Sequence, residues 1–204
     1  MKDEYFEANR KNWDERALIH SKSEFYYVQK FKKKKNSLPR LEQKELGDIT
    51  GKKILHLQCH FGMDTLSLAY KGAIVTGVDF SGEAVKLARS LSKELRIPAN
   101  FIESNIYSLQ EKLTEQFDIV FTSYGVLCWL LDLEKWANLI YFYLKPGGFF
   151  YIIDGHPYGG LFDYKFKEGL RVGYTYFTGG QAERYEEEYS YASAIKITNC
   201  LNYQ

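Results

Sequence analysis

Two polar turns in this 204-residue chain are spaced as they would be around a bound nucleoside. The first, Gln58-Cys59-His60-Phe61-Gly62, follows the mostly apolar segment 54–57, and the second, Asp79-Phe80, follows the β-branched segment 73–78. If both segments are parallel strands, Asp79 stands at the carboxyl end of the second one. An aspartate there can accept two hydrogen bonds from a ribose diol. The spacing therefore predicts a site for a ribose-bearing cofactor.

The first turn lacks the three glycines of a dinucleotide-binding fingerprint. Gln58 and His60 stand where two of them would fall. Side chains at these positions obstruct the close backbone approach that a pyrophosphate needs. The turn therefore disfavours a nicotinamide or flavin dinucleotide and favours a cofactor with adenosine but no phosphates. The alternative is a packed strand-helix-strand unit without a cofactor.

Strand and helix patterns alternate through the middle of the chain. Apolar runs predict three further strands, and helical spacing of apolar residues predicts two helices. The predicted strands cover residues 100–104, 117–124 and 149–154, and the predicted helices cover 66–70 and 130–144. Such alternation implies an α/β fold, with a Rossmann-like, mostly parallel sheet and helices on both faces.

The chain resembles the class I S-adenosylmethionine-dependent methyltransferases. It looks most like the bacterial type-11/12 small-molecule group with an HLQCHFG-type first motif. The matching segments, in order, are ILHLQCHFGMDTLSLA, GAIVTGVDFS, FIESNIYSL, FDIVFTSYGVLCWL and LKPGGFFYIID, and they cover roughly residues 51 to 157. NWDERALIHSKSEFYYV and LGDITGKK, nearer the amino terminus, are also similar to that group. The resemblance implies methyl transfer from S-adenosylmethionine to a small-molecule acceptor, with S-adenosylhomocysteine as product.

The same resemblance implies which residues bind the methionine half of the cofactor. The turn after the first strand would lie against it, and a residue at the end of the fourth strand would lie near the methyl group. These residues are Gln58, Cys59, His60 and Gly62 in the turn, and Ser123 on the strand. Many relatives have glycines where Gln58 and His60 stand, so these two side chains set the chain apart.

The adenosine half is implied to bind further along the sheet. Asp79 would bind the ribose hydroxyls, Phe80 would pack on the adenine, and Asn105 with Ile106 would meet the adenine edge. Many relatives have aspartate where Asn105 stands, but an asparagine can still donate to a ring nitrogen and accept from the exocyclic amine. Relatives often carry an acid where His56 stands, and a hydrogen-bonded structural role is the simpler interpretation of this histidine.

The sequence identifies no catalytic residue. A base is needed only if the acceptor arrives protonated, and His156, His20 and Tyr124 are the candidates that face the expected cleft. An amphipathic helix over residues 4–20 is expected to form a lid. Trp13, His20, Tyr26 and Tyr27 are then candidates for the substrate pocket, and lid packing is the alternative for each.

The expected organisation is an amino-terminal helical lid segment (1–50) and a methyltransferase domain (51–204) in one globular unit.

The tail is shorter than the family pattern, with one strand expected within 185–197. The fifth strand would then be an exposed edge, through which a homodimer could form. This short tail and the departures named above favour a rival function, a catalytically degenerate or truncated methyltransferase-fold protein that binds the cofactor or a partner. The intact Asp79-Phe80 and the fourth-strand sequence favour the leading hypothesis, an active methyltransferase.

Composition argues against several other classes of protein. A formal net charge of +1 gives no electrostatic reason to expect nucleic acid or a membrane surface. The basic run 30–35 is short and is expected to be a solvated loop. Three widely spaced cysteines form neither a metal-binding motif nor a disulfide framework. Without a signal-peptide pattern or a membrane-spanning apolar run, a cytoplasmic location is expected.

Overall fold

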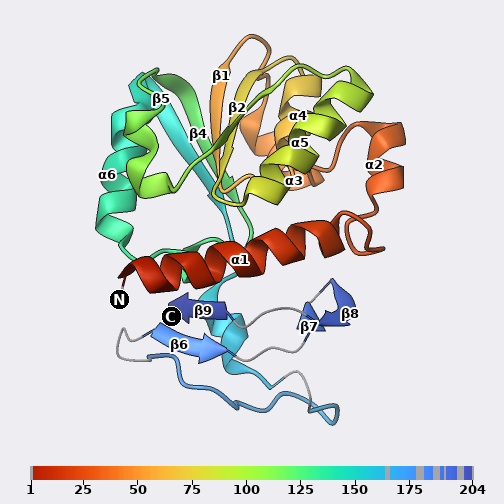
Figure 1. Cartoon of the computed structure of the whole chain (residues 1–204), viewed down its shortest axis with the longest axis vertical. Coiled ribbons are helices and arrows are strands. Elements are labelled where there is room, and N and C mark those ends of the chain that lie inside the picture. The colour runs from red at the N-terminus through yellow and green to blue at the C-terminus, as the bar shows by residue number, and fades with distance from the viewer. Residues whose placement is uncertain are drawn as a thin grey trace.

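The central element of the fold is a five-stranded sheet (Figure 1). A computed structural model of the protein describes residues 2–163, 166–177, 182–185, 189–190, 192–196 and 200–203. All strands of the sheet are parallel, in the order β3-β2-β1-β4-β5. They are β1 (Lys53–Leu57), β2 (Ile74–Asp79), β3 (Asn100–Glu103), β4 (Phe117–Ser123) and β5 (Leu144–Ile153). The predicted fold class is therefore confirmed.

Helices cover both faces of this sheet, as expected. They are α4 (Met63–Tyr70), α5 (Gly82–Leu95) and α6 (Leu133–Tyr143), with short 3-10 turns η1 (Ile106–Glu111), η2 (Leu127–Trp129) and η3 (Pro157–Leu161). Trp136, Leu139 and Tyr143 of α6 pack with Leu55 and Val120 in one apolar core. The opposite face carries two further clusters, to which α4 and α5 contribute. Burying apolar side chains on both faces is what fixes a parallel sheet between helix layers.

The boundary between α6 and β5 differs from the expectation. The sequence predicts a helix that ends at residue 144 and a strand that begins at residue 149, but β5 begins directly at Leu144 and includes Lys145-Pro146-Gly147-Gly148. The strand accommodates this segment through a register shift between Phe117 and Ile119 of β4. Gly147 has a φ of 80°, which a side chain would disfavour.

Three helices precede the sheet: α1 (Lys2–His20), α2 (Val28–Lys34) and α3 (Arg40–Leu46). Figure 1 shows α1 running across one end of the sheet, between it and the tail strands. The basic run 30–35, expected as a loop, lies mostly in α2 because Phe31 is buried in the core beside α5. Lys32 also forms an ion pair with Glu94 of α5 at 2.8 Å.

The inner face of α1 is mostly polar, although Phe6, Trp13 and Ala17 also pack inward, so the expectation of an amphipathic helix with an apolar buried face is wrong. Asn9, Asn12, Arg16 and His20 are buried, whereas Leu18 is exposed. The physical reason is the surface that the helix covers. The carboxyl end of a parallel sheet presents turns and backbone polar groups, which polar side chains can satisfy.

The tail forms two small antiparallel pairs apart from the main sheet. β6 (Ala182–Tyr185) pairs with β9 (Cys200–Tyr203), and β7 (Tyr189–Ser190) pairs with β8 (Ser193–Lys196). A single strand within 185–197 was therefore wrong where the structure describes the chain, and residues 186–188, 191 and 197 lie outside the described residues. In the described sheet, β5 pairs with β4 and forms one end.

Candidate functional site

The turn after β1 keeps the backbone of a glycine-rich turn although it carries side chains. Gln58 and His60 both have a φ of 51°, and Gly62 has a φ of 78°. Non-glycine residues in this left-handed region are disfavoured by about 1–2 kcal/mol each. Hydrogen bonds hold the turn, from the Cys59 amide to the Val78 carbonyl (2.9 Å) and from the Gly62 amide to the Cys59 carbonyl (3.0 Å).

Asp79, at the end of β2, ties this turn to the next one. Its Oδ2 accepts a hydrogen bond from the His60 amide (2.7 Å), and its Oδ1 accepts one from the Ser81 amide (2.9 Å). Burial raises the pKa of Asp79 to about 6, although these backbone hydrogen bonds oppose the rise. Asp79 is therefore mostly ionised at neutral pH. Each carboxylate oxygen has a second lone pair and can accept a further hydrogen bond.

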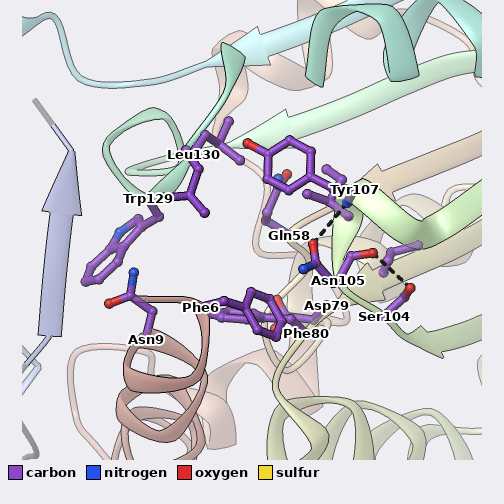
Figure 2. Close-up of a pocket in the computed structure, with 13 residues that line it drawn as sticks. Phe6, Asn9, Gln58, Asp79, Phe80, Ser104, Asn105, Tyr107, Trp129 and Leu130 are labelled. Carbon is purple, nitrogen blue, oxygen red and sulfur yellow. Dashed lines mark hydrogen bonds between the residues drawn. The ribbon is translucent and has the colours of Figure 1, made fainter. Parts of the chain in front are cut away.

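A mainly apolar cavity lies beside Asp79, between the sheet edge and α1 (Figure 2). Its wall comes from α1, from the turns after β1, β2 and β3, and from the segment around η2. The lining residues are Phe6, Asn9, Gln58, Val78, Asp79, Phe80, Ser104, Asn105, Ile106, Tyr107, Trp129, Leu130 and Leu131. Parallel sheets commonly bind ligands at this position, outside the carboxyl ends of the strands.

The cavity brings together five of the nine residues named from the sequence, which are Gln58, Asp79, Phe80, Asn105 and Ile106. Figure 2 shows Phe80 beside Phe6 of α1. The centroids of these two rings lie 5.4 Å apart. Helix α1 therefore contributes an aromatic ring to the cavity, which the sequence did not identify.

Two amide side chains offer hydrogen-bond donors at the cavity. Asn105 accepts a hydrogen bond from the Tyr107 amide through Oδ1 (3.0 Å), which leaves its NH2 group to donate. Gln58 Oε1 lies 3.3 Å from Thr122 Oγ1, and its buried Nε2 has no hydrogen-bond partner. A buried donor without a partner costs about 1–3 kcal/mol, so a ligand that accepts from Gln58 Nε2 would recover that energy.

The other four named residues do not line this cavity. Cys59 is buried, and burial raises the pKa of its thiol well above the usual value, so it is not a reactive thiolate. His60 packs in an aromatic cluster, and Gly62 packs against the core. Ser123 faces α4, where its hydroxyl donates to Asp64 Oδ2 at 3.3 Å.

Histidines 20 and 60 form a packed cluster under α1 and are poorly placed to act as bases. His20 Nδ1 lies 3.0 Å from His60 Nε2, with Trp13 and Tyr26 against the rings. Burial, with a smaller contribution from Arg16, lowers the pKa of His20 to about 4. For Trp13, His20 and Tyr26, the contacts favour lid packing over substrate binding.

The two other histidines also have structural or peripheral positions. His56 is buried in β1, its Nδ1 lies 2.8 Å from Thr65 Oγ1, and burial lowers its pKa to about 3. His156 is exposed and accepts a hydrogen bond from the Tyr158 amide. Tyr27, a further candidate for the pocket, is also exposed.

Tyr124 is the remaining candidate base. Its hydrogen-bond partner, Glu42, was not predicted from the sequence. The Tyr124 hydroxyl donates a hydrogen bond to Glu42 Oε1. Glu42 belongs to α3, a short helix of mostly charged residues in which no signal distinguished it from its neighbours. Among the described residues, no three histidine, cysteine or acidic side chains come together as a metal site.

The part of the chain that forms the sheet and its turns is similar to known proteins. A family model described as a methyltransferase domain matches residues 55–152. A ubiquinone biosynthesis O-methyltransferase of Photorhabdus laumondii is 34% identical over 102 residues, which cover 50% of this chain and 42% of that protein. The protein of the same name from Pseudomonas syringae is 30% identical over 120 residues, which cover 58% and 51%. The chain thus spans about half the length of the curated relatives it matches.

Two solved structures share the architecture. An S-adenosylmethionine-dependent methyltransferase from Clostridium acetobutylicum aligns with a TM-score of 0.52 at 19% identity, over 72% of this chain and 55% of that one. A complex described as DhpI-SAM-HEP aligns with a TM-score of 0.54 at 19% identity, over 79% and 68%. At such identities the likeness concerns the fold alone.

Proposed function

We propose that this chain, whose residues 55–152 belong to the methyltransferase domain family, is a class I S-adenosylmethionine-dependent methyltransferase that acts on a small molecule. The observation that carries the proposal is Asp79, a buried carboxylate at the end of β2 in the wall of an apolar cavity. This is the place and the chemistry that a ribose diol requires.

The residues around the cavity fit an adenosine with no phosphates. Phe6 and Phe80 offer ring surfaces for a purine, and Asn105 offers an amide to its edge. Gln58 Nε2, which lacks a partner, suits an acceptor atom of the ligand. The side chains of Gln58 and His60 occupy the turn that would otherwise cradle a pyrophosphate, so a dinucleotide fits less well.

In the proposed reaction, the protein mainly binds, orients and excludes water. S-adenosylmethionine supplies a methyl group that its sulfonium makes electrophilic. The turn at Gln58–Gly62 would hold the methionine half, and α1 would cover the carboxyl edge of the sheet. Alignment of an acceptor with the methyl carbon can lower the barrier by about 7–11 kcal/mol.

We further propose that the methyl group is transferred to an oxygen atom, because the names of the relatives support this acceptor. Two of them, at 34% and 30% identity, are named as O-methyltransferases, although the chain covers only about half of each. The acceptor is therefore proposed as a small hydroxyl compound. Residues 1–50 are proposed as the lid segment and residues 51–204 as the methyltransferase domain.

The experiment is a transfer assay with S-adenosylmethionine carrying a radiolabelled methyl group, offered with a panel of phenols, alcohols, carboxylic acids, amines and thiols. The proposal predicts labelled product with a hydroxyl compound. Labelled product with amines alone would contradict the oxygen assignment. Binding of S-adenosylhomocysteine without transfer to any compound would instead favour the catalytically degenerate rival. Binding of NAD in place of S-adenosylhomocysteine would favour an oxidoreductase.

The proposal extends to partners and location. The edge of β5 could pair with a second copy of the chain, so a homodimer is proposed, and sedimentation showing only monomer would count against it. A net charge of +1 supports a small-molecule partner rather than nucleic acid. The free, buried thiol of Cys59 suits the reducing cytoplasm, which cell fractionation would test.

A further inference from the structure

A second group of polar residues lies at the carboxyl end of β4, outside the cavity described above. Tyr124 immediately follows β4, has a φ of 42° and is 51% exposed. Its amide donates to the Ile153 carbonyl (2.7 Å), so the neighbouring strand β5 holds it in this disfavoured conformation. Non-glycine residues in such conformations cluster at functional sites.

The exposed tyrosine leads to a buried acid. The Tyr124 hydroxyl donates to Glu42 Oε1, and Glu42 is completely buried. The second carboxyl oxygen, Oε2, is also buried and has no hydrogen-bond partner. A carboxylate with one unsatisfied oxygen is expensive to bury, so this group favours the protonated form.

The neighbours of Glu42 act in the same direction. Burial is the main cause that raises the pKa of Glu42 to about 7, and the acids Asp64 of α4 and Glu45 of α3 add to it, while the Tyr124 hydrogen bond opposes it. Tyr151 of β5 faces the group as well, and its hydroxyl donates to Glu45 at 2.7 Å. A carboxyl poised near neutral pH can accept a proton during turnover.

We propose that Tyr124 and Glu42 form a proton relay for a hydroxyl acceptor, with Tyr124 as the catalytic residue and Glu42 acting through it. The proposal rests on the proposed function. Among the groups considered as bases from the sequence, Tyr124 is the one whose side chain joins exposed surface to a buried proton acceptor.

The atoms and electrons of the step balance. The acceptor oxygen forms a bond to the methyl carbon while the bond between that carbon and sulfur breaks, and the sulfur keeps the electron pair. The acceptor O–H bond breaks, and its proton moves to Tyr124 Oη. The original Tyr124 proton moves to Glu42 Oε1, and the proton is later lost to solvent.

The first test needs no acceptor. Infrared titration of protein with 13C-labelled glutamate carboxyl groups would follow Glu42 as the difference between wild type and Glu42→Gln. The relay predicts a carboxyl that titrates near pH 7 and moves higher in Tyr124→Phe, because the phenol hydrogen bond that favours its ionised form is lost. Titration at the pKa of an ordinary glutamate, or no response to Tyr124→Phe, would overturn the proposal.

The second test compares phenol with thiophenol as acceptors. A thiol ionises far more readily than a hydroxyl, so its methylation needs no relay. Tyr124→Phe and Glu42→Gln should each slow transfer to phenol by about 100-fold or more, as for loss of a general base, and change transfer to thiophenol only a few-fold. Lys44→Gln, the matched control at an exposed position on the same helix, should retain both activities.

Equal loss with both acceptors would show a structural role and overturn the relay, as would unchanged transfer to phenol. If the wild-type protein binds S-adenosylhomocysteine and methylates neither probe, the infrared titration decides the proposal. If it does not bind S-adenosylhomocysteine, the proposed function fails and the relay fails with it, whereas normal binding with an ordinary titration of Glu42 overturns the relay alone.

Discussion

Replacing Gly62 with alanine should destabilise the fold strongly, because the turn after β1 leaves no room for a side chain. An added Cβ would lie 2.7 Å from Phe101 Cε1 and 2.9 Å from Ala88 Cβ. Both neighbours are buried in the core, so neither can move freely. Overpacking of this kind costs about 1–3 kcal/mol. The φ of 78° adds about 1–2 kcal/mol, and the stiffer unfolded chain returns about 0.4–1 kcal/mol.

The expected net loss for Gly62→Ala is therefore about 1–4.6 kcal/mol, measured as the free energy of unfolding in urea. Gly51→Ala is the matched control, because Gly51 has a similar φ of 71° but no atom within 4 Å of an added Cβ. This control should lose at most about 1.6 kcal/mol, and less than Gly62→Ala by the overpacking cost of about 1–3 kcal/mol. Equal losses in the two variants would refute the reasoning, since they would show that the contacts with Phe101 and Ala88 carry no cost.

Three further predictions concern the turns and the buried acid. Because folding raises the pKa of Glu42 from 4.5 to about 7, its contribution to stability is present below pH 4.5 and is lost as the pH rises through 7. Urea unfolding should therefore show Glu42→Gln gaining on wild type between pH 5 and pH 8 by up to about 3 kcal/mol, and a constant difference would contradict this. Ser81→Ala removes two hydrogen bonds of the Ser81 hydroxyl, which accepts from the Ala84 amide at the start of α5 and donates to Asp14 of α1. The variant should lose about 1–2 kcal/mol in the same assay. No loss would contradict a stabilising role of Ser81 as the N-cap of α5. Gln58→Gly relieves the left-handed backbone and should change the free energy of unfolding by less than about 1 kcal/mol. Calorimetry should nevertheless show S-adenosylhomocysteine binding about 5–150-fold weaker, and unchanged affinity would exclude a hydrogen bond from Gln58.

The central strands β1, β2 and β4 could be predicted because they are largely buried on both faces. Apolar runs such as residues 119–121 of β4 indicate such strands. Gly62 after β1 and Asp79 at the end of β2 indicate where the turns lie. Helix and strand boundaries were less certain. Leu144 ends a helical pattern and begins β5 at once, because a bulge in the pairing with β4 accommodates the proline and glycines.

The sequence also placed four residues that line one cavity in the structure, because they lie at or just after the carboxyl ends of predicted strands. These residues are Asp79, Phe80, Asn105 and Ile106, and their role in binding adenosine stays a prediction. The contributions of the amino-terminal segment were not predicted. Phe6 reaches the cavity and Glu42 reaches Tyr124 through tertiary packing of α1 and α3 on the sheet. No local sequence pattern distinguishes either residue from its neighbours. Because the inner face of α1 is mostly polar, the spacing of apolar residues does not predict which of its residues are buried.

The central claim is that Asp79 anchors the ribose of S-adenosylmethionine, and calorimetric titration with S-adenosylhomocysteine tests it most directly. Two hydrogen bonds to a charged group are worth about 1.5–3 kcal/mol each, so Asp79→Asn should bind about 100-fold more weakly or worse. Asp48→Asn, at an exposed aspartate outside the cavity, should bind as the wild type does. Wild-type binding that is lost in Asp79→Asn, with both variants folded, would support the account. Unchanged affinity in Asp79→Asn, or no binding by the folded wild-type protein, would contradict it.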